Sequence, residues 1–151
     1  MLEHEVEGLV ALLWSKNTAA ACDAFRKLQD MSRASSCVYP HLDEFFELLE
    51  DRSSLARNRA IGLIAANARW DEQGVLEAKL PLLLNHLTDD KPITARQCVQ
   101  AMPEIALACP ALRGAILSAL DSADFSAYRD SMRPLLQKDA IQAAAEIRGM
   151  G

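Results

Sequence analysis

The 151-residue sequence is poor in aromatic residues, which make up 5% of the chain, and no segment alternates apolar and polar residues as a strand would. It also lacks an apolar run approaching the ~18 residues that a membrane span needs. The N-terminal segment MLEHEVEGLVALLW is acidic where a secretory signal would be basic. These absences argue against strands, membrane spans and export, and predict a cytoplasmic protein.

Closely spaced metal ligands are also missing. The four cysteines, Cys22, Cys37, Cys98 and Cys109, lie 15, 61 and 11 residues apart, and the three histidines are isolated. Zinc and iron–sulphur sites need ligand pairs on one turn. The spacing therefore predicts no metal and no cofactor, and the apolar surroundings predict buried or partly buried free thiols.

Catalytic motifs and excess positive charge are absent. No nucleophile elbow, phosphate loop, HExxH pattern or glycine-rich cradle occurs, so the sequence predicts no catalytic residues and no enzyme. The net charge is -5; residues 1–51 hold 4 Lys and Arg against 10 Asp and Glu. Because nucleic-acid affinity depends on cations that neutralise phosphates, the composition argues against a nucleic-acid partner.

What the sequence does contain is helical periodicity along almost its whole length. Polar turns, most of them carrying Asn, Asp, Ser or Pro, separate the apolar-periodic stretches. They divide the chain into about eight helices, predicted over residues 2–15, 18–33, 39–51, 54–69, 74–88, 92–108, 110–121 and 126–148.

The predicted helices form pairs that resemble one another. When the ends of the odd-numbered helices are aligned, Leu13, Leu49, Leu87 and Leu120 fall in register, at offsets of 36, 38 and 33 residues. A self-similar period of one helical hairpin is typical of an α-solenoid. We therefore predict an all-α fold, a right-handed α-solenoid of about four hairpins in one domain over residues 1–151. The approximate repeats are 1–36, 37–72, 73–109 and 110–151.

At these positions the sequence resembles the HEAT repeat, whose first helix ends in Leu-x-Asp and whose second helix opens with Val-Arg-x-x-Ala. The nearest matches are the segments 95–99 (ARQCV) and 56–60 (ARNRA). Three segments, ARNRAIGLIAANARWD, DDKPITARQCVQAMPEIALACP and YRDSMRPLLQKD, resemble more narrowly a small bacterial HEAT-like family labelled "SufBD protein". That resemblance implies, as one alternative, an accessory role in iron–sulphur cluster assembly.

Arginines recur near the start of the second helices, each after a turn that carries an Asp. The pairs are Asp51 with Arg57, Asp89 with Arg96, and Asp121 with Arg129. A charge-assisted bond at each position would tie one repeat to the next, and contact with a ligand is the alternative.

Prolines and tryptophans carry further expectations. Pro81, Pro103 and Pro134 lie within the helical patterns and predict bends. Trp14 is expected in the core, and Trp70 is expected to pack against the next repeat.

A polar face on the second helices predicts where a partner binds. In the helix from residue 92, an apolar face leaves Gln97, Gln100 and Glu104 on the opposite side. The same register, shifted by 33, selects Asp130, Arg133 and Gln137 in the last helix. Second helices line the inner side of most HEAT arrays, so we expect these six residues to share a groove that binds a protein or peptide. Simple solvation of this face is the alternative.

An enzymatic alternative also follows from the architecture. Alkylpurine DNA glycosylases with a HEAT-like array use Trp, Asp and Arg, and Trp70, Asp71 and Arg96 or Arg133 could form such a set. The low positive charge and short length favour the binding module instead, as a monomer or a weak homo-oligomer.

Overall fold

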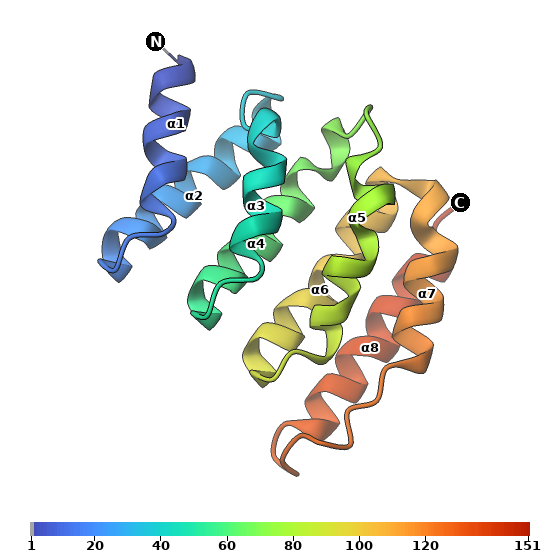
Figure 1. Ribbon diagram of the computed structural model, residues 1–151. Helices are drawn as coiled ribbons and strands as arrows, with labels where there is room; N and C mark the ends of the chain where they lie inside the picture. The colour runs from blue at the N-terminus through green and yellow to red at the C-terminus, as the bar shows by residue number, and fades with distance from the viewer. Residues whose placement is uncertain (1) are drawn as a thin grey trace. The chain divides into compact units, whose positions relative to one another are not determined.

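The computed structural model describes residues 2–151, which form eight α-helices and four short 3-10 helices (Figure 1). No strand occurs among these residues, so the predicted all-α class is confirmed. The α-helices are α1 (Leu2–Leu12), α2 (Thr18–Ala34), α3 (Leu42–Leu48), α4 (Ser54–Asn67), α5 (Val75–Leu84), α6 (Pro92–Ala108), α7 (Arg113–Ser122) and α8 (Arg133–Arg148). The 3-10 helices are η1 (Tyr39–His41), η2 (Ala68–Trp70), η3 (Asn85–Thr88) and η4 (Pro110–Leu112).

The chain divides into two compact units, the first ending at Glu72 and the second beginning at Gln73. In the first unit, α1 packs against α2, α3 packs against α4, and α2 packs against α4. Its interior is built from large aliphatic and aromatic side chains, including Leu28, Phe45 and Leu63, all fully buried. Burial of these apolar surfaces is the main stabilising contribution to the unit.

Side-chain caps set the starts of α2 and α4. The Asn17 side chain accepts a hydrogen bond from the Ala20 amide at 3.1 Å, and Ser53 Oγ accepts one from the Ala56 amide at 3.3 Å. Each cap satisfies one of the amides that a helix N-terminus leaves unpaired. The predicted turns at Asn17 and before Ser54 therefore do begin helices.

Helices α2 and α4 approach closely at Gly62. A Cβ atom at this position would lie 2.8 Å from Cζ of Phe25 on α2. Farther along, the Asn67 side-chain amide donates to Ser32 Oγ at 3.0 Å, and the Trp70 indole donates to the Ser32 carbonyl at 2.6 Å. These contacts fix α4 and η2 against α2.

In the second unit, η3 packs against both α5 and α6, while α6 packs along α8 and α7 packs against both α6 and α8. Fully buried side chains of Leu83, Met102, Ile105, Ile116 and Leu136 fill the space between these helices. The longest shared interface is between α6 and α8, which run side by side (Figure 1).

The last helix begins later than predicted. α8 starts at Arg133, seven residues after the expected start at 126, and the preceding segment forms turns. Pro134 consequently lies in the first turn of the helix, where its missing amide hydrogen costs nothing, so the expected mid-helix bend there is wrong. Pro81 and Pro103 do lie inside α5 and α6, as predicted.

The four leucines aligned across the predicted repeats, Leu13, Leu49, Leu87 and Leu120, are all buried. The expectation for Trp14 is wrong, because α1 ends at Leu12 and the indole stays 42% exposed in the following turn. Trp70 is half-buried, and its indole is bonded to α2 of the preceding hairpin. Within residues 2–151, no helix is both long and apolar enough to cross a bilayer.

Candidate functional site

The predicted polar face of α6 exists. Gln97 and Gln100 are exposed and Glu104 is half-buried. The opposite face is fully buried and consists of Ala95, Cys98, Val99, Met102, Ile105 and Ala106. The helical period alone therefore placed this face correctly.

The six predicted residues do not share one groove. Gln100 lines a groove between α6 and α8, whereas Arg133 and Gln137 line a separate hollow between α7, the segment after it and α8. Asp130 precedes α8, is fully exposed, and pairs with Arg133 at 2.9 Å. The prediction assumed that a residue of α6 and the residue 33 positions later occupy the same place in their helices. This is wrong because α8 starts later than expected, and Asp139 rather than Arg133 lies opposite Gln100.

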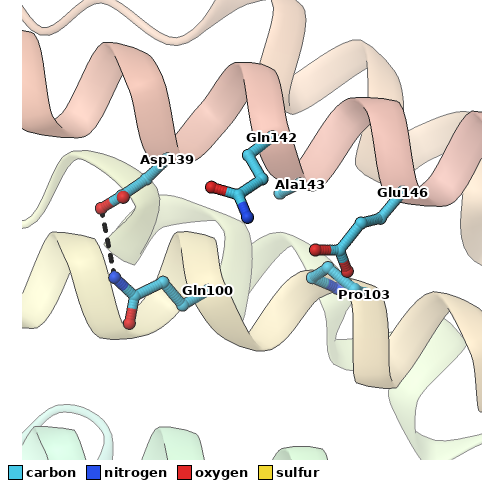
Figure 2. Close-up of a pocket in the computed structure, with 6 residues that line it drawn as sticks. All are labelled: Gln100, Pro103, Asp139, Gln142, Ala143 and Glu146. Atoms are coloured by element: carbon cyan, nitrogen blue, oxygen red, sulfur yellow. Dashed lines mark hydrogen bonds between the residues drawn. The ribbon is translucent and has the colours of Figure 1, made fainter.

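The groove between α6 and α8 has a cavity of about 230 Å³ and a mainly polar lining (Figure 2). Gln100 and Pro103 come from α6, and α8 contributes Asp139, Gln142, Ala143 and Glu146. The small Ala143 side chain leaves space between the two helices, and the Gln142 amide extends into that space (Figure 2).

One residue of this groove, Asp139, belongs to an ion pair between the two helices. Arg96 Nε donates to Asp139 Oδ2 at 2.6 Å and Arg96 Nη2 donates to Asp139 Oδ1 at 3.2 Å. The Gln100 amide adds a third bond to Asp139 at 3.3 Å. The hydrogen bond from Asp139 raises the pKa of the Arg96 guanidinium, because it stabilises the charged form. This carboxylate is therefore already neutralised and oriented.

The polar side chains along the rest of the groove have no partners among the described residues. The Gln142 amide and the Glu146 carboxylate are exposed, and neither has a hydrogen bond or ion pair with any side chain in residues 2–151. Their positions follow from α8: Asp139, Gln142 and Glu146 are spaced by three and four residues and share one face. Sequence reasoning missed this stripe because it carried a register over from the previous repeat instead of deriving the buried face of α8 itself.

Two of the predicted Asp–Arg pairs, those of Arg96 and Arg129, do not form. Arg96 reaches across to α8 rather than to Asp89 or Asp121. Arg129 is exposed and has no partner among the described residues, and Asp121 pairs with Arg148 at 2.5 Å. Arg57 donates to the backbone carbonyls of Asp51 and Arg52, each at 3.0 Å, so it does brace its own turn.

A buried polar cluster that the sequence did not indicate surrounds Asp89, at the turn between η3 and α6. Asp89 accepts bonds from the Lys91 amide at 2.9 Å and interacts with His86 Nδ1 at 2.6 Å, while Tyr128 Oη donates to its backbone carbonyl. Burial and the Asp89 charge raise the pKa of the Cys98 thiol strongly and that of Tyr128 to about 12. A thiol with a raised pKa is a poor nucleophile, so this cluster braces the turn.

All four cysteines are free thiols, with Cys98 buried and the others partly exposed, as predicted. Within residues 2–151, no group of three or more His, Cys, Asp or Glu side chains is placed to hold a metal ion.

The residues of the enzymatic alternative are engaged in bonds within the protein. The Trp70 indole is bonded to Ser32, and Asp71 accepts a 2.6 Å bond from Tyr39 Oη. Arg96 is paired with Asp139, and Arg133 donates to the Tyr128 carbonyl at 2.9 Å.

Comparisons with known proteins found no matching family model, no similar curated protein and no similar solved structure.

Proposed function

We propose that this protein is a non-enzymatic binding module that holds a segment of another protein in the groove between α6 and α8. The observation that supports this proposal is a pair of exposed side chains without a partner among the described residues, Gln142 and Glu146, in the groove that Gln100 and Pro103 also line. Polar groups that line a concave surface without partners of their own are available to a ligand.

The amides suit the main chain of an extended peptide. A glutamine amide both donates and accepts hydrogen bonds, as a backbone peptide group does. Gln100 already gives one N–H to Asp139, which leaves its carbonyl oxygen available, and Gln142 keeps all of its bonding capacity. Two such amides on facing helices can bond one stretch of peptide backbone without reading its sequence.

The charge of the groove selects a basic peptide. Its lining contains two carboxylates and no cation, and Arg96 neutralises only Asp139. Glu146 is left to pair with a Lys or Arg of the partner, and the net charge of -5 favours encounter with a cationic segment. Such a partner would bind more weakly as salt increases.

Titration with a library of short Lys- and Arg-containing peptides tests the proposal. For the best peptide, we expect the double variant Gln142→Ala/Glu146→Gln to bind at least about tenfold more weakly, while unfolding within about 0.5 kcal/mol of the wild type. The matched control is Gln137→Ala, on the same helix but in the other hollow. Equal loss in the control, or no loss in the double variant, contradicts the groove assignment.

We also propose, from the aligned leucines and the resemblance to HEAT repeats, that the hairpins continue as one solenoid. A compact protein of this length has a radius of gyration of about 15 Å. Small-angle scattering of the isolated protein should give a larger value if the repeats stack in a row. A value of about 15 Å counts against the solenoid.

The alternatives predict other outcomes. An alkylpurine glycosylase-like protein would bind duplex DNA at low salt, and an iron–sulphur accessory factor would co-purify with assembly components. We propose instead a monomer or weak homo-oligomer in a reducing compartment such as the cytoplasm, where the four free thiols persist.

A further inference from the structure

A hollow of about 420 Å³ in the first unit lies where the turn between α1 and α2 meets the turn between α3 and α4. Trp14 and Lys16 line it from the first of these turns, Arg52 lines it from the second, and Leu55 and Arg59 line it from α4. Neither the predicted sites nor the proposed function uses this hollow.

Arg59 is the unusual residue in this hollow. Arg59 is only 9% exposed. Its side chain has no hydrogen bond or ion pair with any of residues 2–151. The side-chain polar atoms that are sealed from solvent without a partner belong to Asn58, Asn67 and Thr94. The Arg59 nitrogens therefore keep access to the hollow that they line. A guanidinium that lines a hollow and has no partner within the protein is available to an anionic ligand.

Two further cations stand beside Arg59. Lys16 and Arg52 are exposed and have no ion pair among the described residues, and Asp51 is the single acidic residue in the lining. Up to residue 72 the chain holds 8 Lys and Arg against 12 Asp and Glu, so three of its eight cations gather here. The charged residues of the lining therefore sum to +2, although the first unit as a whole is acidic.

The backbone adds to this positive potential. α2 begins at Thr18 and α4 is capped by Ser53, and both residues line the hollow. The caps satisfy the Ala20 and Ala56 amides, so the first amides of each helix are not used within it. Two helix N-termini with free amides favour an anion at this position.

The hollow also has an apolar wall. Trp14 is 42% exposed and Leu55 is 50% exposed, and both line it beside the cations. A ligand that places an anionic group on Arg59 can pack an organic group against these two side chains.

We propose that this hollow binds a phosphate monoester whose phosphoryl group contacts Arg59, Lys16 and Arg52 and whose organic part packs against Trp14 and Leu55. A monoester carries a charge of about -1.5 to -2 at neutral pH, which matches the net charge of the lining better than a single carboxylate does. The guanidinium of Arg59 can bond two phosphoryl oxygens at once. The monoester is a small organic phosphate or a phosphorylated side chain.

Calorimetric titration of the full chain with phenyl phosphate tests this site, followed in parallel by the NMR signal of the Trp14 indole. We expect saturable binding that shifts the Trp14 signal and weakens at least about tenfold in Arg59→Met. Because the Arg59 side chain makes no hydrogen bond or ion pair with residues 2–151 that the substitution would break, Arg59→Met should melt near the wild-type temperature, so loss of binding reports the site and not unfolding. The matched control is Arg26→Met, an exposed unpaired arginine on α2 outside the hollow, which should bind like the wild type.

Comparison with three other ligands tests which chemical groups of the ligand the hollow recognises. Benzoate binding as tightly as phenyl phosphate overturns the preference for a phosphate dianion, and inorganic phosphate binding as tightly overturns the role of Trp14 and Leu55. A phosphoserine tripeptide distinguishes the sources: tighter binding than phenyl phosphate assigns the site to a phosphorylated protein, and weaker binding assigns it to a small molecule. Absence of saturable binding to every monoester, or unchanged affinity in Arg59→Met, overturns the proposal.

Discussion

Arg96 on α6 donates two hydrogen bonds to Asp139 on α8, although the two residues are 43 positions apart in the chain. The Arg96 side chain is 29% exposed and the Asp139 side chain is 11% exposed. The pair is charge-assisted and bidentate, and it lies where α6 and α8 pack together. It replaces the turn-bound partner that the repeated Asp–Arg spacing predicts.

Replacing Arg96 should destabilise the protein. Arg96→Ala leaves the mostly buried Asp139 carboxylate with only the Gln100 amide, and we expect a loss of about 1–2 kcal/mol in the free energy of unfolding, measured by urea denaturation. Arg129→Ala is the control, because Arg129 is exposed and has no partner among the described residues. It should change stability by less than about 0.5 kcal/mol. Equal effects of the two substitutions contradict a stabilising role for the Arg96–Asp139 pair.

Substituting Ala for Gly should lower the free energy of unfolding at one position and raise it at another. Gly62→Ala places a Cβ 2.8 Å from Phe25 and forces that ring to move, so we expect a net loss of about 1 kcal/mol despite the better helix propensity of Ala. At Gly8 in α1 a Cβ meets nothing within 4 Å, so Gly8→Ala should gain about 0.5–1 kcal/mol. Thermal unfolding followed by circular dichroism measures both. Stabilisation by Gly62→Ala would show that the half-buried Phe25 ring moves aside at little cost.

Tyr128 should make stability fall at high pH. Its pKa is raised to about 12 from an ordinary value of 10, so the folded state holds the phenol proton that the unfolded state releases between these pH values. Stability is fully present below pH 10 and decreases as the pH rises to 12. The hydrogen bond to the Asp89 carbonyl is lost with the proton, so the advantage of about 1 kcal/mol that we expect over Tyr128→Phe at pH 8 should vanish across this window.

A direct titration of Tyr128 is possible because the chain has only two tyrosines. In Tyr39→Phe, absorbance at 295 nm reports Tyr128 alone. A midpoint of 10 while circular dichroism still shows folded protein would contradict the burial of this phenol beside Asp89.

The four thiols should separate into two classes of reactivity. Cys98 is buried and its pKa is raised by desolvation, whereas Cys22, Cys37 and Cys109 are partly exposed. Because the thiolate is the reactive form, a disulfide reagent should label the three partly exposed thiols in the native protein and the fourth only after denaturation. In Cys98→Ala the native and denatured counts should be equal. Rapid labelling of Cys98 in the native protein would contradict its position in the core.

The helical period predicted much of the local structure because it depends only on neighbouring residues. The apolar face of α6 is buried as expected, and Leu13, Leu49, Leu87 and Leu120 are all buried. The start of α8 was missed because the stretch after Phe125 has the same apolar spacing as a helix. Pro134 signalled the true start, since proline is favoured in the first turn.

By itself, then, the sequence determined the all-α class, the order of the helices and which face of α6 is polar, because a period of 3.6 residues assigns faces without knowledge of any neighbour. Only the tertiary structure decided that Arg96 binds Asp139 and that Gln100 shares a groove with Gln142 and Glu146. It alone left Arg59 buried without a partner and Trp14 exposed beside it. These relationships join residues from different helices, and such distances are set by how side chains of both helices pack, which no local pattern encodes.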